Sequence, residues 1–201
     1  SGKSTLAFEL ERRCRAAGIA TTLVEQDWYR QRSWDNRTPD GFRTWEGKQF
    51  TDWAKLEEAV EEAVASAQRQ ADVIIVEGYL LLDCTRSLFE RFDGFIWVES
   101  TKAQCRKRRW QVPRDWPDAV AYVDRCVWPV HEEYAARVSK LCLFDAEDTA
   151  DLKHGRLQNL VQSPALWMAP EQDAEQRADR AFEWLRAFHP PKTEPAEGEL
   201  C

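Results

Sequence analysis

The strongest constraint on the fold is a run of four consecutive apolar residues, Val73 to Val76, in the segment DVIIVEG at 72–78. A run this short, without polar alternation, is typical of a strand that is buried on both faces. The segment GFIWVES at 94–100 repeats the pattern, and ATTLVEQD at 20–27 and LCLFDA at 141–146 also predict strands. Strands of this kind require helices on both faces of their sheet.

The segments between these strands predict helices. Apolar residues recur at helical spacing over 4–17, 52–69 and 171–188, and 101–110 and 130–140 are also expected to be helical. Asp52 is a suitable N-cap for the helix at 52–69. The alternation predicts an α/β fold with a mostly parallel central sheet. Residues 147–168 show no clear periodicity, and we expect a loop there.

Length and composition limit the class of protein. We expect a single domain at 1–189, followed by a disordered tail at 190–201 that is rich in Pro and Glu. The net charge of −7 argues against a nucleic-acid partner. The chain contains neither an apolar run near the roughly 20 residues of a membrane span nor a signal-peptide pattern, which favours the cytoplasm. Six cysteines without a C-x-x-C pair favour reduced thiols.

The first five residues, Ser1, Gly2, Lys3, Ser4 and Thr5, match the end of the phosphate-binding pattern G-x-x-x-x-G-K-[ST]. In such a loop, backbone N–H groups at a helix N-terminus bind phosphate oxygens. The lysine contacts the terminal phosphates and the hydroxyl binds Mg²⁺. The match also fits simple helix capping, in which Ser1 only begins a helix. On the functional interpretation, the strand and the leading glycine that precede this pattern are not in the chain.

Two acidic residues follow predicted strands. Asp27 ends the strand at 20–27 and Glu77 ends the strand at 72–78. Ligands of open α/β sheets bind at the carboxyl ends of the strands, so both acids are expected near Lys3 and Ser4. A carboxylate there can accept the proton of a substrate hydroxyl. The alternatives are a turn or capping acid for Asp27 and a solvent-exposed strand end for Glu77.

A dense basic run, CRKRRW at 105–110, follows the strand at 94–100. Such a run is either a solvated helix face or a set of arginines that offsets the charge of a transferred phosphate. The proline-rich stretch WQVPRDWPDA at 110–119 then predicts a mobile lid over about 106–120. The chain has no N-K-x-D or D-x-x-G segment, so a small-molecule kinase fits better than a GTPase.

Six segments together resemble the nicotinamide riboside kinases, within the wider uridine-kinase-like group. They are SGKST at 1–5, EQDWY at 25–29, DGFRTWE at 40–46, IIVEGYLLL at 74–82, CRKRR at 105–109 and YVDRCVWP at 122–129. They occur in family order over residues 1 to about 145. The resemblance implies a P-loop kinase fold, a three-layer sandwich whose first strand precedes Ser1. It implies transfer of the terminal phosphate of ATP to the 5′-hydroxyl of nicotinamide riboside, which gives nicotinamide mononucleotide for NAD salvage.

The resemblance also implies roles for the residues around the triphosphate. Residues 1–5 and Arg108 would bind ATP, and Lys3 would contribute directly to catalysis. Asp27 would be the general base toward the 5′-hydroxyl. The family's Mg²⁺ would be held by Ser4, Asp27 and Glu77.

For the nucleoside, the resemblance implies that Asp27, Trp45, Glu46 and Arg109 bind the substrate. Trp45 falls where the family stacks an aromatic ring on the pyridinium, and Glu46 falls where a carboxylate holds the ribose hydroxyls. The chemistry agrees, because a Trp face attracts a cationic ring by roughly 0.5–2 kcal/mol. Trp45 could instead be a core aromatic residue, since the chain has ten tryptophans.

Two other functions remain open from the sequence. The chain could be a uridine-kinase-like enzyme that acts on another nucleoside. It could also be a truncated, non-catalytic member of the fold that keeps only a binding role. The Trp45–Glu46 pair discriminates between the substrates, because a cationic base gains more from stacking on indole than a neutral base does.

Overall fold

The structure, a computed structural model, describes residues 2–31, 37–70, 73–111, 119–141, 155–156 and 164–188. Its helices are α1 (Lys3–Ala16), α2 (Trp53–Gln70), α3 (Arg86–Phe89), α4 (Lys102–Gln111), α5 (Ala119–Tyr122), α6 (Trp128–Leu141) and α7 (Ala174–Phe188). Its strands are β1 (Thr21–Glu25), β2 (Val73–Glu77), β3 (Phe95–Val98), β4 (Gly155–Arg156) and β5 (Pro164–Met168). Shorter turns are the 3₁₀ helices η1 (Gln26–Tyr29), η2 (Lys48–Phe50) and η3 (Leu81–Asp83) and the π-helix η4 (Val123–Val127).

The strands form two small sheets rather than the single central sheet expected from the sequence. β1 pairs in parallel with β2, from Thr21 opposite Val73 to Glu25 opposite Glu77. β3 pairs in parallel with β5, and the two-residue β4 is antiparallel to β5. The fold is therefore mixed helix and strand with parallel pairing, as an α/β class requires.

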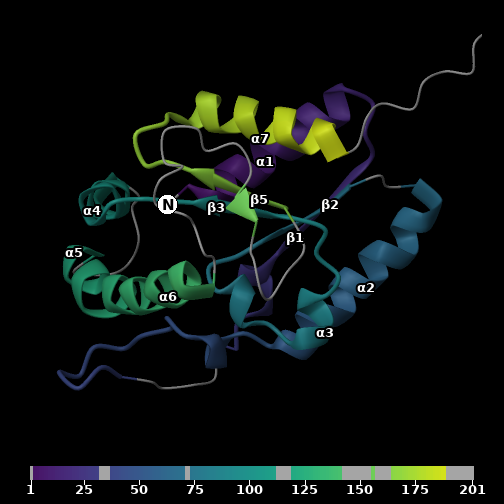
Figure 1. Ribbon diagram of the computed structural model, residues 1–201. Coiled ribbons are helices and arrows are strands. Elements are labelled where there is room, and N and C mark those ends of the chain that lie inside the picture. Colours follow the sequence, from purple (N-terminus) through teal and green to yellow (C-terminus); the bar gives the residue numbers. More distant parts are fainter. Residues whose placement is uncertain are drawn as a thin grey trace, which may run out of the picture.

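Successive side chains of each strand point to opposite faces of the sheets, and each face packs against different helices. One apolar cluster packs α1 and α7 against both sheets, using Val73 and Ile75 of β2 and Ile96 and Val98 of β3. Figure 1 shows α1 and α7 side by side on this face. On the other face, α2 and α3 pack against β1 and β2. α6 packs there against β3. The helices thus cover both faces of strands whose residues are apolar on both sides.

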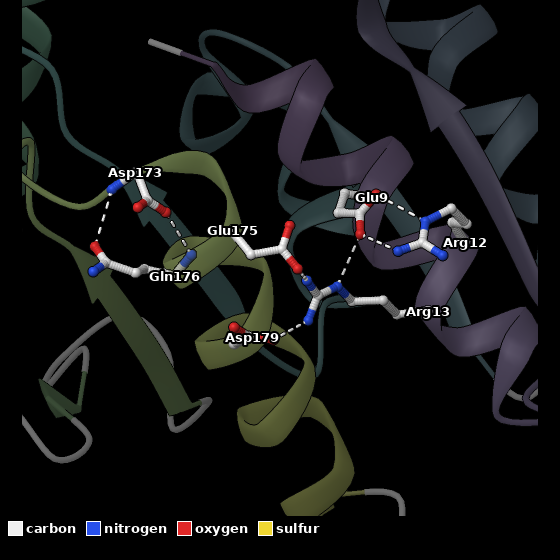
Figure 2. Close-up of polar contacts among 7 residues, drawn as sticks. All are labelled: Glu9, Arg12, Arg13, Asp173, Glu175, Gln176 and Asp179. Carbon is white, nitrogen blue, oxygen red and sulfur yellow. Dashed lines mark hydrogen bonds and ion pairs between the residues drawn. The ribbon is translucent and has the colours of Figure 1, made fainter.

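Polar contacts fix α1 against α7, as Figure 2 shows. Arg13 of α1 forms ion pairs with Glu175 and Asp179 of α7, and its Nε donates to Glu9 at 3.0 Å. The acidic partners on α7 are exposed, so each pair contributes at most about 1 kcal/mol. α7 itself begins with a reciprocal capping box. The N–H of Gln176 donates to Asp173 Oδ1 at 2.8 Å, and the N–H of Asp173 donates to Gln176 Oε1 at 3.1 Å.

The helices and strands predicted before residue 141 are found within a few residues of their expected bounds. Asp52 is the N-cap of α2, because its Oδ1 accepts from the N–H of Lys55 at 3.2 Å. The loop predicted at 147–168 is wrong for 155–156, which form β4, and for 164–168, which form β5 in the middle of the second sheet. The strand predicted at 141–146 is wrong at Leu141, which ends α6, and 142–146 lie outside the described residues. The tail at 190–201 also lies outside them.

The described residues bear on two further expectations. None of the helices in the described ranges has the length and apolar character needed to cross a membrane. The cysteines at 14, 84, 105 and 126 are free thiols, as the sequence predicted. Burial raises the pKa of the Cys84 thiol to about 12, so this thiol stays protonated and unreactive at neutral pH.

Candidate active site

The N-terminus of α1 is a concentrated positive site. Gly2 precedes the helix with φ 87°, a left-handed conformation that favours glycine. A Cβ built on Gly2 would lie 3.6 Å from Nη1 of Arg108 and 3.9 Å from Nη1 of Arg177. Free backbone N–H groups at the start of a helix of this length favour anions, and Lys3 and the two arginines add full positive charges. The site can therefore hold a phosphate group.

Arg177 is a member of this site that the sequence analysis missed. It lies in α7, is 3% exposed, and donates to the carbonyls of Glu99 at 3.1 Å and Ala169 at 2.9 Å. Burial, and then the charge of Arg108, lower the pKa of Arg177. An anion bound beside it would therefore stabilise the charged guanidinium. The sequence signal for it is a charged residue next to an apolar stripe: Arg177 lies among the buried residues Ala178, Ala181 and Leu185 of α7.

The acids predicted at the ends of two strands lie beside this helix terminus. Ser4 Oγ donates to Glu77 Oε1 at 3.0 Å, and Glu77 is 7% exposed. Burial raises the pKa of Glu77, while the Lys3 charge and the Ser4 hydrogen bond oppose that shift. The negative charge of Asp27 raises the pKa of Glu77 further. The structure thus brings Lys3, Ser4, Asp27 and Glu77 together, and we call these residues with Gly2 the α1 cluster.

Asp27 lies on η1 rather than at the end of a longer strand, because β1 ends at Glu25. Its carboxylate is exposed and forms an ion pair with Arg30 at 2.9 Å, across one turn. An exposed carboxylate is accessible to a ligand, whereas Glu77 is buried. The two acids therefore differ in environment, and only Asp27 is open to a substrate hydroxyl.

A buried glutamine fixes the ends of β1 and β2 relative to each other. Gln26 Nε2 donates to Thr51 Oγ1 at 2.8 Å, and its Oε1 accepts from the N–H of Tyr79 at 2.8 Å. Gly78 is required at this point, because a Cβ there would lie 2.1 Å from Gln26 Oε1. Gln26 precedes Asp27 and Gly78 follows Glu77, so this contact sets the separation of the two acids.

We predict that Glu77→Gln stabilises the protein at neutral pH by on the order of 1 kcal/mol. Because the folded-state pKa of Glu77 is raised, its ionised form costs stability above that pKa. The advantage of the variant should shrink toward zero as pH falls below about 3, where the wild-type side chain is neutral in both states. Urea unfolding across this pH range measures the effect. Glu58→Gln, at an exposed position of α2, is the matched control, and equal pH dependence of both variants would contradict the prediction.

A second cluster lies around Tyr122, which the sequence analysis also missed although it begins the segment YVDRCVWP. Its hydroxyl donates to Glu46 Oε1 at 2.9 Å and accepts from the N–H of Trp45 at 3.4 Å. Burial and the Glu46 charge raise the pKa of Tyr122, which keeps the hydroxyl a donor. The Arg109 guanidinium lies 5.9 Å from the centre of the Tyr122 ring. We call Trp45, Glu46, Arg109 and Tyr122 the Tyr122 cluster.

The two clusters are neighbours. Arg108 and Arg109 are consecutive in α4, and the first reaches Gly2 while the second reaches Tyr122. On the opposite side, Tyr79 follows Glu77 and Gly78, and burial and the Glu46 charge raise the pKa of its hydroxyl. A ligand with an anionic end and a hydroxylated, cationic end would therefore meet suitable groups at both places.

Other predicted site residues are less informative. Thr5 is exposed in the first turn of α1. Ser1 and residues 112–118 of the predicted lid lie outside the described residues. The remainder of the lid segment is helical, at the end of α4 and the start of α5.

The donors of the α1 cluster fit Mg²⁺ better than a transition metal. Within the described ranges there is no group of three or more His, Cys, Asp and Glu side chains arranged to hold a metal ion. Mg²⁺ does not need such a cage, because it is usually bound through one or two carboxylates, waters and the phosphates of the substrate. The hydroxyl of Ser4 and the carboxylates of Glu77 and Asp27 supply that kind of partial site.

No model of a known protein family matches this chain, and no curated protein matches it. Its function must therefore be inferred from the chemistry of the two clusters.

Proposed function

We propose that this protein is a kinase of the nicotinamide riboside kinase type that transfers the terminal phosphate of ATP to the 5′-hydroxyl of nicotinamide riboside. The observation that carries the proposal is the α1 cluster. In it, a helix N-terminus with Lys3 adjoins a Ser4–Glu77 pair and the open carboxylate of Asp27, and Arg108 and Arg177 lie beside Gly2. We further propose that the domain, at 1–189, has the P-loop three-layer architecture and works in the cytoplasm.

In this mechanism, the terminal phosphates of ATP bind at the start of α1, where Lys3 and Arg108 offset their charge. Asp27 accepts the proton of the 5′-hydroxyl. The 5′-oxygen forms a bond to the γ-phosphorus while the bond from that phosphorus to the β–γ bridging oxygen breaks, and ADP leaves. Ser4, Glu77 and Asp27 would hold Mg²⁺, which neutralises charge on the phosphates when bound.

The Tyr122 cluster supports the choice of nucleoside. Tyr122 occupies one oxygen of Glu46 and so fixes the carboxylate, whose other oxygen can accept from the ribose hydroxyls. The half-buried indole of Trp45 offers an electron-rich face to a pyridinium ring. A neutral base such as uracil would lack that cation–π attraction.

We predict that Trp45→Ala raises the KM for nicotinamide riboside by about 2- to 30-fold, the range that corresponds to a cation–π contact. The KM for uridine should change by less, because its base carries no charge. Steady-state kinetics with both nucleosides measure the two effects, and Trp45→Phe is the conservative control that should retain most of the affinity. An equal loss for both substrates would count against stacking on the pyridinium.

A further inference from the structure

A short hairpin carries Trp45 and Glu46, the two side chains proposed to bind the nucleoside. Residues 37 and 43 pair in antiparallel fashion, and the N–H of Thr38 donates to the carbonyl of Phe42 at 2.8 Å. Trp45 and Glu46 follow this turn directly, and we call residues 37–46 the site hairpin. A hairpin this short is not stable by itself in water. Its position therefore depends on the contacts that it makes with the rest of the chain.

Tyr122 holds the end of the site hairpin that carries the two side chains. Its buried hydroxyl donates to Glu46 Oε1 at 2.9 Å and accepts from the N–H of Trp45 at 3.4 Å. These contacts fix one end of the hairpin. A segment that is held at one end can still pivot about that end, so the direction of the hairpin needs a second point of contact.

Arg125 makes contacts of this kind at the exposed tip. Its Nη1 donates to Asp40 Oδ2 at 2.8 Å, and its guanidinium carbon lies 4.5 Å from the centre of the Phe42 ring. The hydrogen bond from the Thr38 hydroxyl and, less strongly, the charge of Arg125 lower the pKa of Asp40, so this carboxylate is ionised at neutral pH. One guanidinium thus binds both residues that flank Gly41, through an ion pair and a cation–π contact.

Arg125 extends from a well-anchored element. It belongs to η4, a π-helix, and short π-helical turns occur frequently at functional sites. The neighbouring Asp124 forms ion pairs with Arg106 and Lys102 of α4. The hydroxyl of Tyr79 donates to the carbonyl of Val127 at 3.2 Å. η4 is therefore tied to α4 and to the end of β2, and Arg125 connects the site hairpin to this framework.

We propose that Arg125 is a positioning residue for the nucleoside, which holds the tip of the site hairpin so that Trp45 and Glu46 meet the base and the ribose in a fixed geometry. Arg125 acts through the hairpin and is not itself a catalytic residue. The inference rests on the proposed function and deepens it, since it assigns control of nucleoside affinity to a residue outside both clusters.

The first test is the steady-state kinetics of Arg125→Ala. We expect the KM for nicotinamide riboside to rise about 3- to 10-fold, as for the loss of one surface ion pair and one exposed cation–π contact. The KM for ATP and kcat should stay within about twofold, because only nucleoside binding depends on the hairpin. Arg125→Lys keeps a cation at this place and should recover most of the affinity. Arg91→Ala, which removes a comparably exposed ion pair with Glu61, is the matched control and should leave all three constants unchanged.

The second test needs no activity. Amide exchange of Phe42 and Trp45, whose N–H groups donate to Thr38 Oγ1 and to the Tyr122 hydroxyl, should be about 3- to 10-fold faster in Arg125→Ala than in the wild type or in Arg91→Ala.

The two tests separate this inference from the proposed function. Wild-type exchange rates at Phe42 and Trp45 in Arg125→Ala would overturn the inference, even if the wild type phosphorylates nicotinamide riboside. Equal changes in kcat and in both KM values would also overturn it, because Arg125 would then have a general structural role. A wild type that forms no mononucleotide would refute the proposed function, and the exchange rates would still decide whether Arg125 holds the hairpin.

Discussion

Lys3→Ala should lower kcat for phosphoryl transfer by about 10³-fold, the cost of removing one preorganised charge from a transition state. Lys3 begins α1 and its charge acts on Glu77, so it lies where the phosphate-binding N–H groups and the acids meet. The defect should appear in kcat more than in the KM for ATP, since charge on the transferring group develops in the transition state.

Lys107→Ala is the matched control for this variant. Lys107 is an exposed lysine of α4, next to Arg108, and it should be replaceable with little loss of activity. Steady-state kinetics with ATP and nicotinamide riboside, after the folded state of each variant is checked by circular dichroism, make the comparison. If both lysine variants lose activity to the same small extent, Lys3 has only a general electrostatic role.

Asp27→Asn should lower kcat by about 10²- to 10⁴-fold, the usual contribution of a general base. Asparagine keeps the size of the side chain but cannot accept the proton of the 5′-hydroxyl. Because Asp27 is exposed and its ion pair with Arg30 lies at the surface, stability should change by no more than about 0.5 kcal/mol.

Asp93→Asn controls for the loss of a surface carboxylate, because Asp93 is an exposed residue before β3. Urea unfolding and single-turnover phosphoryl transfer separate stability from chemistry in both variants. Retention of the wild-type single-turnover rate by Asp27→Asn would show that another group accepts the proton.

Much of the fold could be predicted because the strands are buried on both faces and the helices have one apolar face. β2 and β3 stand out as short apolar runs, and α2 and α7 as stripes at helical spacing. β5 was missed because its five residues begin with a proline and are too few to show a period. The division into two sheets could not be predicted, since periodicity reports the face of a strand and not its partners.

The candidate site was predictable where it depends on strand ends and was missed where it depends on tertiary packing. Asp27 and Glu77 could be identified because β1 and β2 are parallel neighbours and end together. Arg177 and Tyr122 come from distant segments, and their contacts with Gly2 and Glu46 depend on how α7 and α5 pack. Spacing along a single sequence does not encode those contacts.

Product analysis tests the central claim most directly. The chain is incubated with ATP, Mg²⁺ and either nicotinamide riboside or uridine, and the products are separated and identified by mass. We predict nicotinamide mononucleotide and ADP in equal amounts, with a higher kcat/KM for nicotinamide riboside than for uridine. Phosphorylation of uridine alone would contradict the substrate, and no mononucleotide from either nucleoside would contradict the assignment of this chain as a nucleoside kinase.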